Sequence, residues 1–312
     1  MAINQRRLGR SEIMIAPLML GGNVFGWTAD EKTSFAILDA FVDLGGNAID
    51  TADVYSAWVP SHTGGESETV LGKWLKQSGK RDRVVIATKV GMWPKRPGIK
   101  RENIVAAAED SLQRLQTDVI DLYQAHRDDN ETPPEEFMAA FDSLVQAGKA
   151  RAVGASNFKA DRLSASLAAS KGARFETLQP EYNLMNRAIE ADLMPLCERE
   201  DVSLIPYYGL ASGFLTGKYR SEADKRKSVR GGRMDSYLNE RGFRVLAALD
   251  AVAERRSAKP AQVALAWIMA KPAIGAPIAS ATNVEQLHEL MGALRLELSA
   301  EDIAALDTAS AT

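Results

Sequence analysis

The sequence predicts an α/β protein, a (β/α)8 TIM barrel with an N-terminal β-hairpin. Short apolar runs alternate with longer amphipathic segments, which is the pattern of a parallel sheet covered by helices. Eight such units fit into roughly 250 residues, the usual size of a closed barrel. An open doubly wound sheet is the alternative, but residues 21–26 match its Gly-x-Gly-x-x-Gly turn poorly. We therefore expect one barrel domain over residues 1–312.

Eight short, largely apolar runs are the expected barrel strands. In chain order they cover residues 17–20, 48–50, 84–89, 119–125, 150–155, 175–179, 202–207 and 277–279. Before the first of them, residues 6–15 place a Leu-Gly-Arg-Ser turn between two short alternating runs. That arrangement predicts the hairpin.

Amphipathic segments between the strands are the expected helices. Asp30 is a favourable N-cap for a helix over residues 31–44. Thr132 is the expected N-cap of a helix with proline in its first turn, and Gly148 ends that helix. Two further helices are expected over residues 66–77 and 101–115.

Composition is that of an ordinary globular protein, with 46% hydrophobic and 25% charged residues. The formal net charge of −3 leaves no cationic surplus for nucleic acid or an anionic membrane. No apolar stretch is long enough to span a bilayer, and the amino terminus lacks the apolar core of a signal peptide. Because Cys197 is the one cysteine, a reducing compartment is indicated. We expect a cytoplasmic protein, either a monomer or a homo-oligomer.

Titratable side chains stand at three expected strand ends. Asp50, Lys89 and His126 end or follow the second, third and fourth runs, and Tyr55 comes just after the first of these residues. Singly, such a lysine is usually solvated and such a histidine is usually a satisfied core residue. The carboxyl ends of parallel strands meet at one rim of a barrel, where its chemistry lies. Their joint occurrence in order therefore favours a functional site.

These residue types form a set for proton transfer. A free phenol is a poor acid at neutral pH, and a lysine ammonium beside Tyr55 would lower its pKa. A buried Lys89 needs a carboxylate partner to keep its charge, and Asp50 is in place to supply it. Tyr55 would then exchange a proton with a carbonyl oxygen that His126 orients and polarises.

The order Asp50, Tyr55, Lys89, His126 resembles the active-site tetrad of the aldo-keto reductase family, which is built on a (β/α)8 barrel. The likeness covers nearly the whole chain and is closest to the bacterial, potassium-channel-β-like branch. It implies an NADP-dependent oxidoreductase that interconverts an aldehyde or ketone and the corresponding alcohol. In such an enzyme Tyr55 is the general acid and base.

The resemblance also implies a cofactor site. Ser156, Asn157 and Gln179 match positions that bind the nicotinamide carboxamide, and Tyr207 matches the aromatic residue under the nicotinamide ring. A loop with small residues would bind the pyrophosphate, and its matching positions are Leu210, Ala211, Gly213, Leu215, Gly217 and Lys218.

The adenosine end of this cofactor site departs from the family pattern. Positions expected to bind the 2′-phosphate are Ser280, Thr282 and Gln286. Ser280 and Gln286 replace the lysine and arginine of strongly NADP-selective members, and Leu290 replaces an asparagine. We therefore expect NADP, with NAD as the alternative.

Loops at the rim should form the substrate pocket, and the candidates are Asn23, Trp27, Trp58, Trp93, Arg127 and Tyr208. Aromatic walls suit a bulky or ring-containing carbonyl, or a sugar face. Each tryptophan has about even odds of being only a packed loop anchor. The expected partner is a small-molecule carbonyl or alcohol.

Two other classes of function stay open. A nicotinamide-binding regulatory subunit with little turnover would share the fold and the cofactor site. A metal-dependent barrel hydrolase or isomerase would need a ligand cluster, and one strand-end histidine is too few, so no metal is expected. Among residues without a role, His62 and His288 are expected on the surface and Cys197 in the core. Residues 218–233, which are polar and basic, are expected to form a mobile surface loop.

Overall fold

The computed structural model describes residues 3–227 and 231–311. Within that part of the chain, eight parallel strands form one sheet in the order β10-β3-β4-β5-β6-β7-β8-β9. Gly275 and Ile278 donate backbone hydrogen bonds of 2.8 Å to the carbonyls of Leu204 and Pro206, and these bonds join the two edges of the sheet. The predicted (β/α)8 barrel is therefore confirmed.

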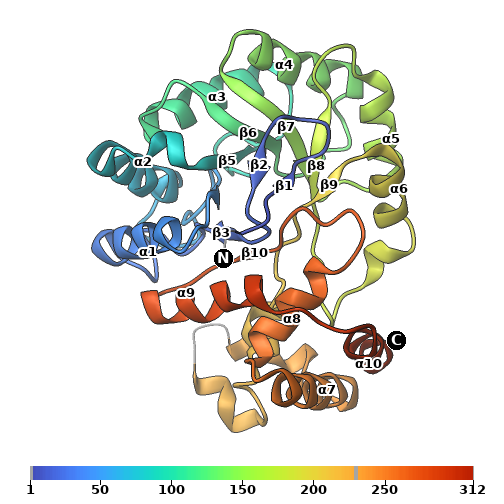
Figure 1. The fold of residues 1–312 in the computed structure, drawn as a ribbon. Coiled ribbons are helices and arrows are strands. Elements are labelled where there is room, and N and C mark those ends of the chain that lie inside the picture. Colours follow the sequence, from blue (N-terminus) through green and yellow to red (C-terminus); the bar gives the residue numbers. More distant parts are fainter. Residues whose placement is uncertain (1–2, 228–230, 312) are drawn as a thin grey trace.

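Helices surround the sheet on its outside (Figure 1). The strands are β3 (Met19–Gly21), β4 (Ala48–Asp50), β5 (Val85–Val90), β6 (Ile120–Ala125), β7 (Ala150–Ser156), β8 (Phe175–Gln179), β9 (Ser203–Leu204) and β10 (Ile278–Ala279). The helices are α1 (Glu31–Asp43), α2 (Glu66–Ser78), α3 (Arg101–Leu115), α4 (Pro134–Gln146), α5 (Ala160–Ala169), α6 (Leu193–Glu200), α7 (Glu240–Arg256), α8 (Pro260–Met269), α9 (Val284–Met291) and α10 (Ala300–Ser310). No helix in residues 3–227 or 231–311 combines the length and apolar composition needed to cross a membrane.

The predicted hairpin is confirmed as β1 (Arg6–Arg7) and β2 (Met14–Ile15), which lie across one end of the barrel (Figure 1). Its apolar side chains join the cluster inside the barrel, where Leu8, Ile13 and Ile15 are buried. Gly9 N–H donates to Ser203 Oγ and Ala16 N–H donates to Asn47 Oδ1, at the amino ends of β9 and β4. The hairpin therefore closes the end of the barrel that faces away from the strands' carboxyl termini.

Most predicted helix and strand positions are confirmed. The prediction for α3 and β8 is correct to the residue, and the Asp30 side chain caps α1 by accepting the Thr33 N–H. The predicted strand over residues 202–207 is longer than β9. Thr132 as the N-cap of α4 is wrong, because Pro133 holds that position. The Thr132 N–H and O–H both donate to the Asp129 carboxylate, which closes a turn before the helix.

The polar segment over residues 218–233, predicted as a mobile surface loop, contains helical turns. Its described parts include the 3-10 helices η4 (Glu222–Lys227) and η5 (Gly231–Ser236), and Lys225 pairs with Glu222 and Asp235. Residues 228–230, in the middle of the predicted loop, lie outside the described residues. The Lys225–Asp235 ion pair joins the two turns, in a stretch whose composition indicated no regular structure.

The residues without a predicted role lie as follows. Cys197 is fully buried in α6, as predicted, and burial raises the pKa of its thiol to about 12, so it is inert. His288 is exposed on α9, also as predicted. His62 is half-buried, and its Nδ1 has no hydrogen-bond partner in the described part of the chain. The surface prediction for His62 is therefore only partly right.

Gly72 marks the closest approach of α2 to α3 and generates a stability prediction. A Cβ at this position would overlap the Arg114 carbonyl oxygen and lie 2.8 Å from the Leu115 carbonyl carbon. Gly72→Ala should destabilise the protein by about 1–3 kcal/mol, although alanine is the better helix former. Urea denaturation measures this change. Lys76→Ala, exposed on the same helix, should stay within about 0.5 kcal/mol of wild type. Equal stability of the two variants would contradict the close packing.

Candidate active site

The four side chains predicted to act together meet at the carboxyl ends of neighbouring strands. Asp50 is the last residue of β4, Lys89 is next to last in β5, and His126 directly follows β6. The Tyr55 hydroxyl, from the turn after β4, lies 3.0 Å from Asp50 Oδ2 and 2.9 Å from Lys89 Nζ. The ring centroids of Tyr55 and His126 are 5.9 Å apart. The barrel therefore brings the acid, amine, phenol and imidazole into one cluster.

Asp50 accepts hydrogen bonds from three different parts of the barrel. Lys89 Nζ donates to Oδ2 at 2.8 Å, and the Tyr55 hydroxyl donates to the same oxygen. Gln179 Nε2, at the end of β8, donates to Oδ1 at 2.9 Å. Charge-assisted hydrogen bonds of this kind replace the water that a carboxylate with 1% exposure has lost. Asp50 is consequently fixed on both of its oxygens.

Lys89 is fully buried, and each N–H of its ammonium has an acceptor. The acceptors are Asp50 Oδ2, the Thr51 carbonyl at 2.7 Å and the Tyr55 hydroxyl. Burial lowers the pKa of Lys89, and the neighbouring Asp50 carboxylate opposes this by favouring the charged amine. The carboxylate partner expected from the sequence is therefore in place.

The pKa of Tyr55 differs from the prediction. Burial raises it well above its usual value, and the adjacent Asp50 carboxylate raises it further. The net direction is therefore opposite to the lowered pKa that was expected beside Lys89, because burial and the Asp50 carboxylate dominate. Tyr55 keeps its proton at neutral pH, and a protonated phenol is the form that can act as an acid.

His126 is a neutral imidazole in this site. Burial lowers its pKa well below the usual value, and the positive charges of Lys89 and Arg127 lower it further. Its Nδ1 is enclosed and has no hydrogen-bond partner among the described residues. A neutral imidazole carries one N–H donor and one acceptor, so His126 can offer a single hydrogen bond to a bound oxygen.

A cavity of about 930 Å³ opens above this cluster and extends along the barrel rim to helix α9. That volume lies at the upper end of the range for ligand pockets. Predicted site residues that line it are Asn23, Asp50, Tyr55, Trp58, His126, Ser156, Asn157, Gln179, Tyr207, Tyr208, Leu210, Gly213, Lys218, Ser280, Thr282 and Gln286. The cavity thus connects the predicted proton-transfer set with both ends of the predicted cofactor site.

Other predicted residues do not line the cavity. Lys89 lies beneath it, and Ala211 and Leu215 point into the core. Gly217 ends the 3-10 helix η3 (Ala211–Thr216) in a left-handed conformation, with φ of 78°. Arg127 is exposed outside the cavity.

The tryptophans divide between pocket wall and loop anchor. Trp58 lines the cavity, is 47% exposed and packs edge-on against Tyr55 with centroids 6.0 Å apart. Trp27 supports it from behind at 5.5 Å. Trp93 donates Nε1–H to the Thr63 carbonyl at 2.8 Å, which makes it a loop anchor, and it does not line the cavity.

Hydrogen bonds among the predicted nicotinamide residues organise this end of the cavity. The Tyr207 hydroxyl donates to Asn157 Oδ1 at 2.8 Å, and Asn157 Nδ2 donates to the His126 carbonyl at 3.0 Å. Asn157, Tyr208 and Ser212 have left-handed backbone conformations, with φ between 55° and 58°. Such conformations cluster at sites where backbone groups face a ligand. The Gly213 N–H donates to the Leu210 carbonyl at 2.9 Å, so this turn closes on itself at the cavity wall.

At the predicted adenosine end of the cavity, the polar groups are neutral or acidic. Ser280 Oγ donates to Asn23 Oδ1 at 2.6 Å, and the Thr282 N–H and O–H both donate to Gln286 Oε1 at 3.0 Å. Glu289 also lines the cavity.

Several lining residues were missed in the sequence, namely Val24, Thr28, Val54, Ala261, Ile278, Ala279 and Glu289. Glu289 stands three residues after Gln286, so helical spacing could have identified it. Ala261, at the start of α8, gives no such signal.

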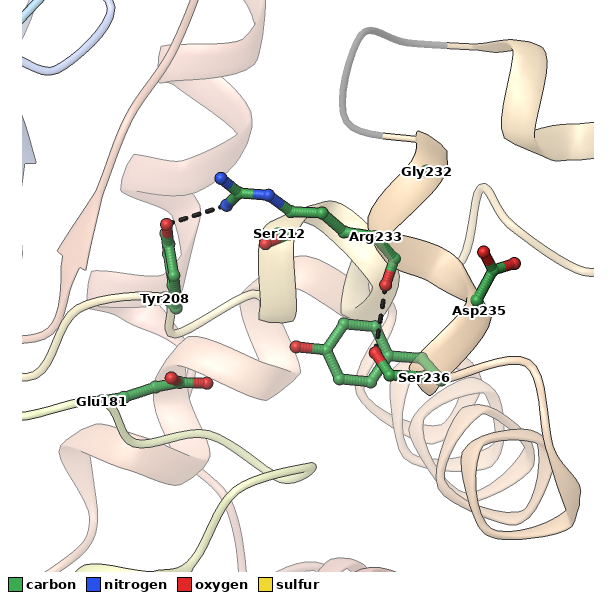
Figure 2. A pocket seen from close by; sticks show the side chains of 8 residues that line it. Glu181, Tyr208, Ser212, Gly232, Arg233, Asp235 and Ser236 are labelled. Carbon is green, nitrogen blue, oxygen red and sulfur yellow. Dashed lines mark hydrogen bonds between the residues drawn. The ribbon is translucent and has the colours of Figure 1, made fainter. Parts of the chain in front are cut away.

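A second cavity of about 360 Å³ adjoins the first and shares Tyr208 and Ser212 with it. Figure 2 shows Arg233 reaching from η5 to the Tyr208 hydroxyl, to which it donates at 2.8 Å. The carboxylates of Glu181 and Asp235 line this second cavity. The hydrogen bond from Arg233 to Tyr208 attaches η5 to the rim of the main cavity.

Residues 3–227 and 231–311 hold no cluster of three or more histidine, cysteine, aspartate or glutamate side chains suited to a metal ion. A barrel that gathers a proton-transfer set below a deep rim cavity has the architecture of an α/β-barrel oxidoreductase. Sequence comparison identifies which one: residues 17–311 match the aldo/keto reductase family, and the chain belongs to that family.

Relatives in this family are similar over nearly their whole length. The uncharacterized oxidoreductase YrpG of Bacillus subtilis is 34% identical over 307 residues, with 94% of this chain and 92% of the relative covered. The aldo-keto reductase YhdN of the same organism is 34% identical over 305 residues, covering 94% and 87%. The aldo-keto reductase yakc [NADP(+)] of Schizosaccharomyces pombe is 30% identical over 313 residues, covering 96% and 89%.

The lowered pKa of His126 predicts its behaviour on titration. Its ring should stay neutral at pH values just below about 6.5, where an ordinary histidine takes up its proton. The unfolded chain takes up this proton below about pH 6.5 and the folded site does not, so His126 favours folding above that pH and the benefit is lost as pH falls. Imidazole 15N NMR measures the protonation, with His126→Gln to assign the signal. A signal that titrates near pH 6.5 would show that the burial is relieved in solution.

Proposed function

We propose that this protein is an NAD(P)H-dependent oxidoreductase that interconverts an aldehyde or ketone and its alcohol, with Tyr55 as general acid and base. The observation that carries the proposal is the buried Lys89 ammonium, which lies within 3.0 Å of both Asp50 and Tyr55 at the floor of the cavity. This arrangement suits proton transfer to an oxygen atom, and it includes neither an activated nucleophile nor a set of metal ligands.

In the reduction, Tyr55 gives its proton to the carbonyl oxygen and becomes a phenolate beside Lys89. The cation 2.9 Å away stabilises the charge that forms on the Tyr55 oxygen. Asp50 keeps Lys89 charged, and neutral His126 donates one hydrogen bond to the same substrate oxygen. Tyr55 takes the proton back in the oxidation of the alcohol. The bound nicotinamide would supply or accept the hydride.

The cavity fits a nicotinamide dinucleotide in shape and in chemistry. Amide groups of Asn157 and Gln179 lie near the phenol for the carboxamide, and Tyr207 offers an aromatic surface for the ring. Small residues at Ser212 and Gly213 leave room for the pyrophosphate at the cavity wall, and Lys218 supplies a positive charge.

The choice between NADP and NAD depends on the adenosine end. The name of the Schizosaccharomyces pombe relative includes NADP(+), which supports NADP for this chain. Against it, Lys218 is the only lysine or arginine that lines the cavity among the described residues, and Glu289 adds a carboxylate. We propose NADP as the cofactor, with NAD as the alternative.

The substrate wall near the phenol is apolar and aromatic. Val54, Trp58, Met92 and Tyr208 form it together with Asn23. Such a wall suits a ring-containing carbonyl, since aromatic faces stack on flat groups and provide little solvation for charge. We propose a small-molecule partner of this kind and, given one buried cysteine, a cytoplasmic location.

Tyr55→Phe tests the proposed role directly. The substitution removes one oxygen from a site that keeps its shape, so kcat should fall by about 10²–10⁴-fold, the usual contribution of acid–base catalysis. Dinucleotide binding should remain within a few-fold of wild type when measured by fluorescence titration. Assays of aldehydes and ketones with both cofactors provide the reference rates. Full activity of Tyr55→Phe would refute the assignment, and a wild-type protein that binds NADPH but reduces no carbonyl would favour the regulatory alternative.

Gln286→Arg tests the position of the 2′-phosphate. A cation here should lower the KM for NADPH by about tenfold, because a hydrogen bond to a charged group contributes about 1.5–3 kcal/mol. The KM for NADH should hardly change, since NADH lacks this phosphate. Gln77→Arg, an exposed position on α2, is the matched control for added charge. Equal changes for both cofactors would mean that the phosphate lies elsewhere.

A further inference from the structure

A buried carboxyl group, Asp53, lies directly behind the proton-transfer cluster. Its backbone N–H donates to the Lys89 carbonyl at 3.2 Å and ties the turn after β4 to β5. The side chain is 1% exposed, and within the described residues neither carboxyl oxygen has a hydrogen-bond partner. The Val54 N–H interacts with it, but without the geometry of a hydrogen bond. Buried polar groups are normally paired, so this unpaired carboxyl requires an explanation.

Charged and polar groups face Asp53 from every element packed against it. They are Glu68 of α2, Lys89 of β5, Tyr123 of β6 and Arg114 of α3. Glu68 accepts from Arg114 Nε at 2.6 Å and from Thr88 Oγ1 at 2.5 Å. The Lys89 ammonium donates to Asp50, Thr51 and Tyr55. Asp53 is therefore left beside these charges without a donor of its own.

This buried region holds one acid more than its cations can balance. The carboxyls of Asp50, Asp53 and Glu68 are at most 1% exposed, and the cations beside them are Lys89 and Arg114. Three carboxylates against two cations would leave a net charge of −1 away from water, which is costly. Asp53 is the carboxyl without a donor, and burial together with repulsion by Glu68 raises its pKa to about 7. Asp53 therefore changes from neutral to charged around neutral pH.

We propose that Asp53 is a second carboxyl that holds Lys89 in its ammonium form above neutral pH. Burial favours loss of the Lys89 proton, and the charge of Asp53 is one of those that oppose this loss. Below pH 7 Asp53 is neutral, and the Asp50 carboxylate alone keeps Lys89 protonated because the proton concentration is high. As the pH rises, Asp53 ionises, and its charge then opposes the loss of the Lys89 proton. Asp53 is thus a positioning residue that acts through Lys89.

This role rests on the proposed function, because Lys89 matters for turnover only if Tyr55 transfers a proton. Asp53→Asn removes the charge and keeps the shape of the side chain. Its kcat/KM for carbonyl reduction should equal that of wild type below about pH 6, because the side chain at position 53 is then uncharged in both proteins. The alkaline decline should begin about one pH unit lower, so that activity in that interval falls about tenfold. An alkaline limb that coincides with wild type overturns the proposal.

Folding stability gives a second measurement that needs no activity. Folded Asp53 keeps its proton up to about pH 7, whereas the unfolded chain releases it near pH 3.9. Wild type should therefore lose stability relative to Asp53→Asn as the pH rises from about 4 to 7, and the difference should then level off. A pH-independent difference in urea midpoint shows that Asp53 does not titrate here and overturns the proposal. The expected stability difference in a protein that reduces no carbonyl would instead refute the proposed function.

Glu176→Gln is the matched control. Glu176, in β8, is a partly buried carboxyl whose pKa is raised by burial, and it accepts the Arg10 N–H far from Lys89. Its substitution should leave the alkaline limb in place, and a shift there would mean that the limb reports only general destabilisation. If Asp53→Asn does not fold, Asp53→Ser removes the same charge and serves in both measurements. In the wild-type protein, 13C NMR should also show an aspartate carboxyl that titrates near pH 7, and its absence would overturn the proposal.

Discussion

Burial of one ammonium group, that of Lys89, is the constraint on which the site depends. A lysine without exposed surface loses its proton unless carboxylate charge and hydrogen-bond acceptors replace water. Asp50, the Thr51 carbonyl and Tyr55 provide three acceptors at 2.8, 2.7 and 2.9 Å. Any arrangement that satisfies the ammonium therefore also holds the phenol oxygen beside a cation. The same contacts serve the stability of the fold and the proposed chemistry.

The barrel stabilises the buried ammonium by placing its partners in register on neighbouring strands. Asp50 pairs with Ala87, two residues before Lys89, so the side chains of β4 and β5 point to the same inner face. Gln179 reaches Asp50 from β8, 129 positions along the chain, and fixes the second carboxylate oxygen. Below them, Ala48, Val85 and Leu122 belong to an apolar cluster inside the barrel. The charged groups therefore lie between a dry interior and the cavity, which strengthens their interactions.

Much of this site was predictable from the sequence because strand ends can be read from local patterns. Runs such as residues 84–89 identify their own ends, and parallel strands bring those ends together. What failed depended on side-chain contacts that strand and helix patterns do not specify. The bond from Gln179 to Asp50 requires a closed sheet, Trp93 is an anchor because Thr63 accepts from it, and Thr132 is taken by Asp129 instead of capping α4. Asp53 lies inside the motif that was recognised, yet its burial depends on how α2 and α3 pack, which no local pattern shows.

The direction of the Tyr55 pKa bears on how the proton is released. In the structure the phenol donates to Asp50 and accepts from Lys89. Its proton therefore lies between the Asp50 carboxylate and the phenol oxygen that is proposed to react. In the proposed reduction, a substrate oxygen must compete with Asp50 for that proton, and it does so only when negative charge develops on it. The Lys89 contact already exists before transfer, so the phenolate forms without rearrangement of its partner. A phenol with a raised pKa beside a fixed cation thus keeps its proton until the acceptor becomes basic, which couples proton transfer to charge development on the carbonyl oxygen.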